Sequence, residues 1–262
     1  MHDLFDICDC DDTMDTTPSM PLIGDDAPAF SASTTNGHVN FPADYAGKWV
    51  ILFSHPSDFT PVCTSEFMVF QSLVKQFRDL NTEIIGLSVG TLSGHLAWLN
   101  AIRDIEWRGW RDMEITFPLI DDMKMEIAKK YGMIQPNASD THAVRAVFII
   151  DPNGKIRAIL YYPMSTGRNF DEILRILIAL QTTEAFGTPT PADWMPGDDV
   201  LVGAPTTTDA MRKLEQRAPR DIDVRAWFMS FRKLSATTIY ERLTRAAKRP
   251  TKSKTKPTRK KK

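Results

Sequence analysis

The residues of this chain best suited to do chemistry lie in one short stretch that ends in a cysteine, Cys63, preceded by Thr60 and Pro61. Threonine suits a helix N-cap, and proline suits the first helical position, where its missing N–H costs nothing. Cys63 then falls in the first turn, where unsatisfied N–H groups and the helix dipole favour a thiolate. The stretch therefore indicates a nucleophilic cysteine, although a buried structural cysteine fits the position equally well.

Ionisation alone explains little of such a cysteine's reactivity. A free thiol is already about 3% ionised at pH 7, so complete ionisation raises its reactivity at most about thirtyfold. A larger gain requires a site that holds the electrophile and stabilises the leaving group. The Thr60 hydroxyl, one helical turn before Cys63, can reach the same ligand, and a distant cation could complete the site.

Alternating strands and helices are predicted to position this stretch. The apolar run from Trp49 to Phe53 is typical of a strand covered on both faces, and Phe67, Phe70 and Phe77 follow helical spacing. Further strands are predicted at 83–89, 117–120, 144–150 and 156–161, and further helices from residue 93, at 123–131 and at 170–180.

The order of these elements predicts the fold class. Three strand–helix units, a hairpin and a last helix indicate a mainly parallel α/β layer fold with an antiparallel edge, of thioredoxin-like kind. After Gly187, prolines punctuate the chain until an aromatic-rich segment at 221–234. This part is too small for its own core, so we expect it to pack on the main domain or on another subunit.

Four segments resemble a known family. Pro56, Thr60 and Cys63 form the pattern P-x-x-x-T-x-x-C, the active-site motif of peroxiredoxins, and the string from His55 to Glu66 resembles the 1-Cys subfamily with a C-terminal dimerisation domain. Three more segments match at 145–152, 166–175 and 190–194. The resemblance covers about residues 20–235 and implies a thiol-dependent peroxidase with a thioredoxin-like fold and a small C-terminal extension.

The resemblance assigns the reacting groups. Cys63 is the peroxidatic thiolate, which attacks one peroxide oxygen of hydrogen peroxide or an organic hydroperoxide and becomes a sulfenic acid. Thr60 hydrogen-bonds the peroxide, and Pro56 shields the thiolate from water.

The resemblance also assigns the groups around them. Arg145 favours the thiolate and helps to hold the substrate, and His55 lines the pocket. Glu66 and Arg168 orient Arg145. No cofactor, prosthetic group or metal is implied, because the oxidant supplies its own weak O–O bond.

The cysteines suggest how the cycle closes. Residues 204–234 contain no cysteine that could resolve the sulfenic acid, which favours a 1-Cys cycle completed by an external thiol. Cys8 or Cys10 could resolve it instead, since a long leader reaches far. The resemblance implies a homodimer, with residues 188–235 reaching across, and leaves higher oligomers open.

Charge is sorted along the chain although the net charge is only −1. Residues 1–30 contain eight Asp and no Lys or Arg, whereas residues 242–262 contain eleven Lys or Arg and no Asp or Glu. We therefore predict a disordered acidic leader at 1–19, a thioredoxin-like peroxidase domain at 20–187, a C-terminal dimerisation domain at 188–236 and a disordered basic tail at 237–262.

The two tails allow further interpretations. The basic tail would attract polyanions weakly and without sequence preference, and it would allow nuclear import. In the leader, His2, Cys8 and Cys10 resemble a soft-metal patch, but C-x-C is not the usual zinc spacing and a second ligand pair is missing. We therefore predict no metal site.

Composition excludes several classes of protein. No run approaches eighteen apolar residues, so no membrane partner is expected, and three cysteines cannot form a disulfide scaffold. These features favour a cytoplasmic location, with the nucleus open through the tail. A second class of function, a redox-sensing or holdase-like oligomer switched by over-oxidation of Cys63, stays open beside the enzyme.

Overall fold

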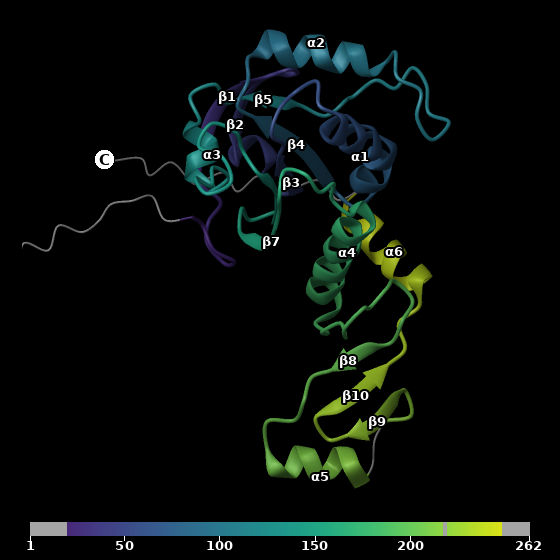
Figure 1. The fold of residues 1–262 in the computed structure, drawn as a ribbon. Coiled ribbons are helices and arrows are strands. Elements are labelled where there is room, and N and C mark those ends of the chain that lie inside the picture. Colours follow the sequence, from purple (N-terminus) through teal and green to yellow (C-terminus); the bar gives the residue numbers. More distant parts are fainter. Residues whose placement is uncertain (1–19, 217–218, 248–262) are drawn as a thin grey trace, which may run out of the picture.

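The computed structural model describes residues 20–216 and 219–247. Its main body contains a seven-stranded sheet of order β2-β1-β5-β4-β3-β6-β7 (Figure 1). The strands are β1 (Phe30–Thr34), β2 (Gly37–Phe41), β3 (Trp49–Ser54), β4 (Thr82–Ser88), β5 (Leu119–Asp121), β6 (Arg145–Ile150) and β7 (Ile156–Tyr162). The helices of the body are α1 (Pro61–Asp79), α2 (Leu92–Ile102), α3 (Glu126–Lys130), α4 (Phe170–Phe186) and the 3-10 turn η1 (Ala43–Tyr45).

The predicted α/β fold with a C-terminal extension is confirmed, but the prediction of a mainly parallel sheet is wrong. Strand β4 pairs in parallel with β3 and β5, whereas β6 runs antiparallel to β3 and β7 antiparallel to β6. The hairpin β1–β2 adds a second antiparallel edge, beside β5. The sequence does not predict this hairpin, because its short strands are rich in Ser, Thr and Asn and bury few residues.

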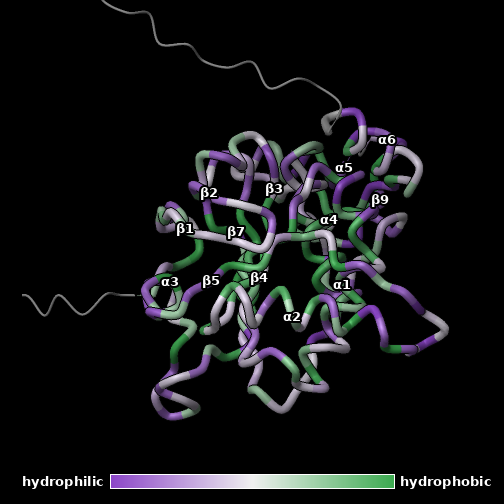
Figure 2. The backbone as a smooth tube through the Cα atoms, turned by 90° about the horizontal axis from the view of Figure 1, so that it is seen from above, coloured by the Kyte–Doolittle hydropathy of each residue, from purple (hydrophilic) through white to green (hydrophobic). Residues whose placement is uncertain are grey.

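Strand β3 divides the core of the body in two. All six of its residues are buried, as its continuous apolar sequence predicts. Ile51 and Phe53 point into a cluster with α1 and α4, while Val50 and Leu52 point into the cluster beneath α3 and the hairpin. In Figure 2 the hydrophobic residues, drawn green, are concentrated in the middle of the body, around β4, α1 and α4.

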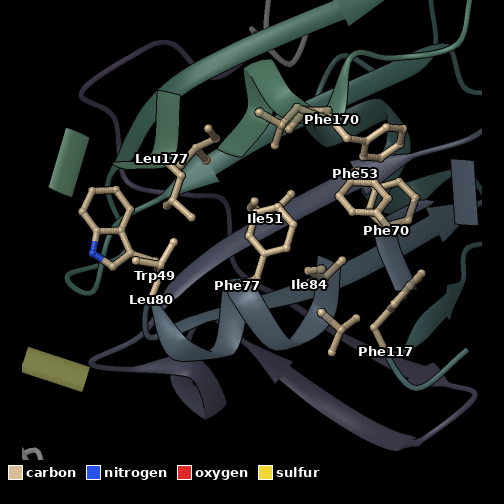
Figure 3. Packing of buried hydrophobic residues seen from close by; sticks show 14 of the residues in the cluster. Trp49, Ile51, Phe53, Phe70, Phe77, Leu80, Ile84, Phe117, Phe170 and Leu177 are labelled. Carbon is tan, nitrogen blue, oxygen red and sulfur yellow. The ribbon is translucent and has the colours of Figure 1, made fainter. Parts of the chain in front are cut away.

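The cluster on the α1 side is rich in aromatic rings. The ring centroids of Phe53 and Phe70 lie 4.4 Å apart, and Phe170 from α4 meets Phe70 edge-on at 4.5 Å (Figure 3). Such offset and edge-on contacts add to the free energy gained from burial alone. These contacts pack α1, whose first turn carries Cys63, against β3 and α4.

The C-terminal part projects from the body and then returns to it. Strands β8 (Val200–Val202), β10 (Met229–Arg232) and β9 (Ile222–Ala226) form a small antiparallel sheet beside α5 (Thr208–Gln216). We call residues 200–232 the arm. Figure 1 shows the arm extended away from the central sheet, with α6 (Ala236–Ala247) back beside α4.

Helix α6 corrects the predicted start of the basic tail. The charge pattern predicts disorder from residue 237, but residues 236–247 are helical. Ile239 and Leu243, one turn apart, are buried in the same cluster as Trp194. The charge count alone hides this apolar face, and the rest of the tail, like the leader at 1–19, lies outside the described residues.

Candidate active site

The loop between β3 and α1 places the cysteine as the sequence predicts. Thr60 is the N-cap of α1 and Pro61 its first residue, so Cys63 lies in the first turn. The Thr60 hydroxyl does not cap the helix: it donates a hydrogen bond to the Ser57 carbonyl, 2.9 Å away. Because its proton is used there, the Thr60 oxygen can face a ligand only as an acceptor.

The neighbour of Thr60 is strained. Phe59 has a backbone φ of 56°, which an aromatic side chain rarely adopts, and its side chain is 63% exposed. Strained residues of this kind persist where the surrounding structure over-determines them, and they cluster at functional sites. The strained backbone therefore supports a functional role for the loop that precedes Cys63.

Cys63 is fully buried and touches one cation. Arg145, the first residue of β6, donates from Nη1 to the Cys63 sulfur across 3.3 Å. The pairing of β3 with β6 brings this arginine, far away in sequence, to the start of α1. A guanidinium and the helix N-terminus together stabilise a negative charge on the sulfur.

A carboxylate joins Arg145 to a second buried arginine. Glu66 accepts hydrogen bonds of 2.7 Å at Oε2 from Arg145 and from Arg168, and its Oε1 accepts the Arg168 backbone N–H at 2.9 Å. Arg168 also donates from Nη1 to two main-chain carbonyls, those of Ser54 and Ala146. Burial lowers the pKa of Arg168, while the charges of Glu66 and Cys63 oppose that shift.

The charges in this cluster balance only with a thiolate. Two guanidinium groups and one carboxylate leave a net charge of +1, and each of the three side chains is at least nine-tenths buried. Buried charge is costly unless it is paired. A thiolate at Cys63 would bring the net charge to zero. Of the three predicted residues, Arg145 contacts the sulfur, while Glu66 and Arg168 are joined to it through Arg145.

One hydrogen-bond partner of Arg145 is a main-chain group, which the residue types of the sequence do not reveal. The main-chain carbonyl of Met164 accepts hydrogen bonds from Nε and Nη2 of Arg145, at 2.9 and 2.6 Å. Together with Glu66 it fixes the plane of the Arg145 guanidinium. A backbone acceptor in a loop leaves no residue-type pattern, so the sequence could not reveal it.

His55 and Pro56 follow β3 directly, and both are buried. The His55 ring packs against Phe67 of α1 at 4.9 Å and against Trp98 of α2 at 5.0 Å between centroids. Its Nε2 faces Asp58 rather than the sulfur. The shielding role predicted for Pro56 and the lining role predicted for His55 stay predictions.

An apolar pocket of about 470 Å³ opens beside Thr60, between α1 and α2. Its walls come from both helices and from the segment after α2. They include Thr64, Met68, Trp98, Ile102 and Ile105.

Metal ligands and membrane-spanning helices can be assessed only for the described residues. Within 20–216 and 219–247, no three His, Cys, Asp or Glu side chains gather as metal ligands. The patch of His2, Cys8 and Cys10 lies outside the residues that the structure describes. Among the described helices, none has the length and apolar character needed to cross a membrane.

Two family models and several relatives match this chain. Residues 23–159 match the AhpC/TSA family, and residues 179–216 match the C-terminal domain of 1-Cys peroxiredoxin. A peroxiredoxin of Methanosarcina mazei is 57% identical over 82% of this chain and 98% of its own length. One from Aquifex aeolicus is 47% identical over 76% of this chain and 92% of its own.

Solved structures extend the likeness to the fold. A yeast mitochondrial 1-Cys peroxiredoxin superimposes with a TM-score of 0.71 at 36% identity, covering 82% of this chain and 100% of that one. A cysteine-to-serine mutant of peroxiredoxin 6 of Arenicola marina gives 0.70 at 30% identity, covering 82% and 99%. With its buried Cys63–Arg145 pair, the chain therefore belongs to the AhpC/TSA family and is a peroxiredoxin of the 1-Cys type, a thiol-dependent peroxidase.

Proposed function

We propose that this chain reduces hydroperoxides through a sulfenic acid at Cys63. The thiolate attacks the terminal oxygen of the hydroperoxide, an S–O bond forms as the O–O bond breaks, and the thiolate supplies both electrons. The leaving oxygen takes up a proton and departs as water or an alcohol. The observation that carries this proposal is the buried cluster of Cys63, Arg145, Glu66 and Arg168, whose charges balance only with a thiolate.

Arg145 also serves the transition state. A guanidinium has five N–H donors. Those of Arg145 reach Cys63, Glu66 and, from Nε and Nη2, the Met164 carbonyl, which leaves one Nη2 hydrogen for a ligand. As charge moves from sulfur to the leaving oxygen, this donor stabilises it. Thr60 accepts the hydroperoxide O–H, because its own proton is bound to Ser57.

The substrates are hydrogen peroxide and organic hydroperoxides. Hydrogen peroxide needs only the polar groups around Cys63. An alkyl hydroperoxide has an apolar chain as well, and the pocket of about 470 Å³ beside Thr60 is apolar and large enough to hold one.

An external thiol completes the cycle in this proposal. Cys63 is the free cysteine of the described residues, and none of them offers a second cysteine as a resolving partner. The thiol resolving mechanism of the similar yeast mitochondrial protein involves glutathione/thioredoxin systems, and we propose a reductant of that kind here. Cys8 and Cys10, outside the described residues, are the alternative that the experiment below distinguishes.

The arm supports a homodimer. Trp227 and Phe228, between β9 and β10, and Met229, the first residue of β10, are 39%, 61% and 44% exposed in a single chain. Covering these apolar side chains with a second copy would remove them from water. Higher oligomers, weak polyanion binding by the basic tail, and a cytoplasmic or nuclear location stay predictions.

The test is to mix reduced protein with a slight excess of hydrogen peroxide and to follow intact mass and remaining thiols. We expect a gain of one oxygen within seconds in the wild type and none in Cys63→Ser. A disulfide between Cys63 and Cys8 or Cys10 would leave peroxide reduction at Cys63 intact. It would show that a cysteine of the leader, rather than an external thiol, resolves the sulfenic acid. No reaction at Cys63 would refute the peroxidase proposal and favour the redox-sensing alternative.

A further inference from the structure

The two steps of the proposed cycle need different amounts of space around Cys63, whose side chain is fully buried. A hydroperoxide brings its reacting oxygen to the sulfur on a small group. An external thiol as large as glutathione must instead bring a second sulfur into bonding distance. In that step the S–O bond of the sulfenic acid breaks, an S–S bond forms, and the oxygen leaves as water with the proton of the thiol. A second thiol then attacks the external sulfur and releases Cys63 as the thiolate, so part of the site must open for these steps.

The walls of the site are not held equally strongly. Strands β3 and β6 pair with each other inside the central sheet, and Glu66 is hydrogen-bonded to both Arg145 and Arg168. The active-site loop, residues 55–60, is attached more weakly. Among the described residues, the hydrogen bonds of residues 57–60 stay within this loop or go to α1, with one exception. The loop is therefore the wall that can move at the least cost.

The exception is a contact between Asp58 and α2, which we call the loop clamp. Oδ2 of Asp58 lies 2.7 Å from Nδ1 of His95. His95 is fully buried, and its Nε2 lies 3.2 Å from the carbonyl oxygen of Ile120, so its ring is held at both nitrogens. Burial by itself raises the pKa of Asp58, but hydrogen bonds with His55 and His95 outweigh burial and lower it to about 2. The clamp is thus a hydrogen bond to an ionised carboxylate, which is stronger than one between neutral groups.

The loop clamp acts on the turn that contains Cys63. The Thr60 carbonyl accepts hydrogen bonds from the backbone N–H and the hydroxyl of Thr64, at 2.9 and 2.8 Å, which joins the loop to this turn. The pocket of about 470 Å³ separates much of this unit from α2, so few contacts hold the two together besides the clamp and the hydrogen bond from Trp98 to Thr64. The strained φ of Phe59 is a conformation that a released loop would leave. The clamp opposes that release.

We propose that Asp58 and His95 are positioning residues that govern access to Cys63: their contact holds the active-site loop closed during the peroxide step and breaks when an external thiol attacks the sulfenic acid. The inference rests on the proposed function, in which the closed loop presents Thr60 to the hydroperoxide. Weakening the clamp therefore speeds the reaction of Cys63 with bulky reagents and does not speed its reaction with hydrogen peroxide.

Two substitutions at one position separate the clamp from the loss of the ring. His95→Gln keeps an amide N–H close to the place of Nε2, facing the Ile120 carbonyl, but removes the group that meets Asp58. His95→Asn keeps an amide close to the place of Nδ1, where it can still donate to Asp58. Both variants lose the imidazole, so a difference between them reports on the contact with Asp58.

Alkylation of the reduced, full-length protein measures access to Cys63 without any peroxide. N-ethylmaleimide is the probe, and peptide mass spectrometry reports Cys63 separately from Cys8 and Cys10. We expect the rate at Cys63 to rise about tenfold in His95→Gln, as for one lost hydrogen bond to a charged group, and to stay near the wild-type rate in His95→Asn. Ile239→Ala, on α6, is the control for a general loss of stability and should leave this rate unchanged.

The two steps of the cycle are then compared in the same variants. Rapid mixing of the sulfenic acid form with glutathione, followed by intact mass of quenched samples, should show faster formation of the mixed disulfide in His95→Gln. Oxidation of the reduced form by hydrogen peroxide should not become faster. If the rate with hydrogen peroxide rises by the same factor as the rate of alkylation, the substitution has changed the ionisation of Cys63 rather than its access, which would overturn the proposal.

Two further results would overturn the role of the clamp: unchanged alkylation of Cys63 in His95→Gln, or equal increases in His95→Gln and His95→Asn. A wild type whose Cys63 does not react with hydrogen peroxide would instead refute the proposed function. The alkylation rates would still show whether the contact between Asp58 and His95 governs access to the sulfur.

Discussion

The active-site cluster and the arm use buried and exposed side chains in opposite ways. In the cluster, Glu66 and both arginines are almost fully buried, and each is paired through several hydrogen bonds. In the arm, α5 has no buried residue and β9 none, and apolar side chains such as Phe228 face outward. The difference teaches that the charged groups around Cys63 find their partners within one chain, whereas apolar side chains of the arm stay exposed in it.

Removing the carboxylate at the centre of the cluster should have the largest effect. In Glu66→Gln, an NH₂ group would face the donors of Arg145 and Arg168, leaving buried cations unpaired. We expect a loss of about 3–5 kcal/mol in the free energy of unfolding, measured by urea denaturation. The control is Glu106→Gln, which breaks an exposed ion pair with Arg111 and should cost less than about 1 kcal/mol. If both variants lose the same free energy of unfolding, the difference claimed between buried and exposed ion pairs would be refuted.

Removing the cation beside the sulfur should mainly affect the rate. We expect Arg145→Met to slow the oxidation of Cys63 by hydrogen peroxide about a hundred- to a thousandfold, as for loss of one transition-state donor. Stopped-flow fluorescence measures this rate. Arg157→Met, at a partly exposed arginine paired with Asp151 and Glu184, should leave the rate unchanged. A fall of less than tenfold in Arg145→Met would count against its role at the leaving oxygen.

Helix α6 joins the arm to the body, and its buried face should have a moderate effect. Ile239 is fully buried, and Ile239→Ala should cost about 2 kcal/mol, near the low end for core truncations because a peripheral helix can readjust. Tyr240→Ala, at the next, 41% exposed residue, should change stability by less than about 0.5 kcal/mol. Thermal unfolding of both variants checks the prediction. If Ile239→Ala leaves the stability unchanged, the result would favour the sequence-based prediction of a disordered tail from residue 237.

The connection between β9 and β10 should have the smallest effect on the stability of one chain and a clear effect on assembly. Phe228 is 61% exposed, so Phe228→Ser should change the free energy of monomer unfolding by less than about 0.5 kcal/mol. If a second copy of the chain packs on the arm, sedimentation equilibrium should show weaker dimerisation in this variant. Unchanged dimerisation would mean that the dimer forms elsewhere.

Local rules predict the nucleophile, and the family resemblance predicts its distant partners. Thr60 and Pro61 place Cys63 in the first turn of α1, which the structure confirms. Arg145 is 82 positions away, and only the resemblance connects it to Cys63. The carbonyl of Met164 could not be found from sequence, because a backbone acceptor depends on the course of the chain rather than on residue type.

Other features escape prediction for different physical reasons. Asp58 and His95 lie on separate elements, and neither position alone signals a shared hydrogen bond. The predicted sheet direction is wrong because the order of elements does not reveal that β6 returns antiparallel beside β3. In α6, positive charges obscure the apolar spacing of Ile239 and Leu243.

The most direct test of the account is the second-order rate constant of reduced wild type with hydrogen peroxide at pH 7, beside that of free cysteine. Ionisation alone can raise the rate at most about thirtyfold. In the proposed mechanism Arg145 and Thr60 hold the peroxide and Arg145 stabilises its leaving oxygen, so we predict a ratio far above thirty that Cys63→Ser abolishes. A ratio near one would contradict a peroxidatic Cys63.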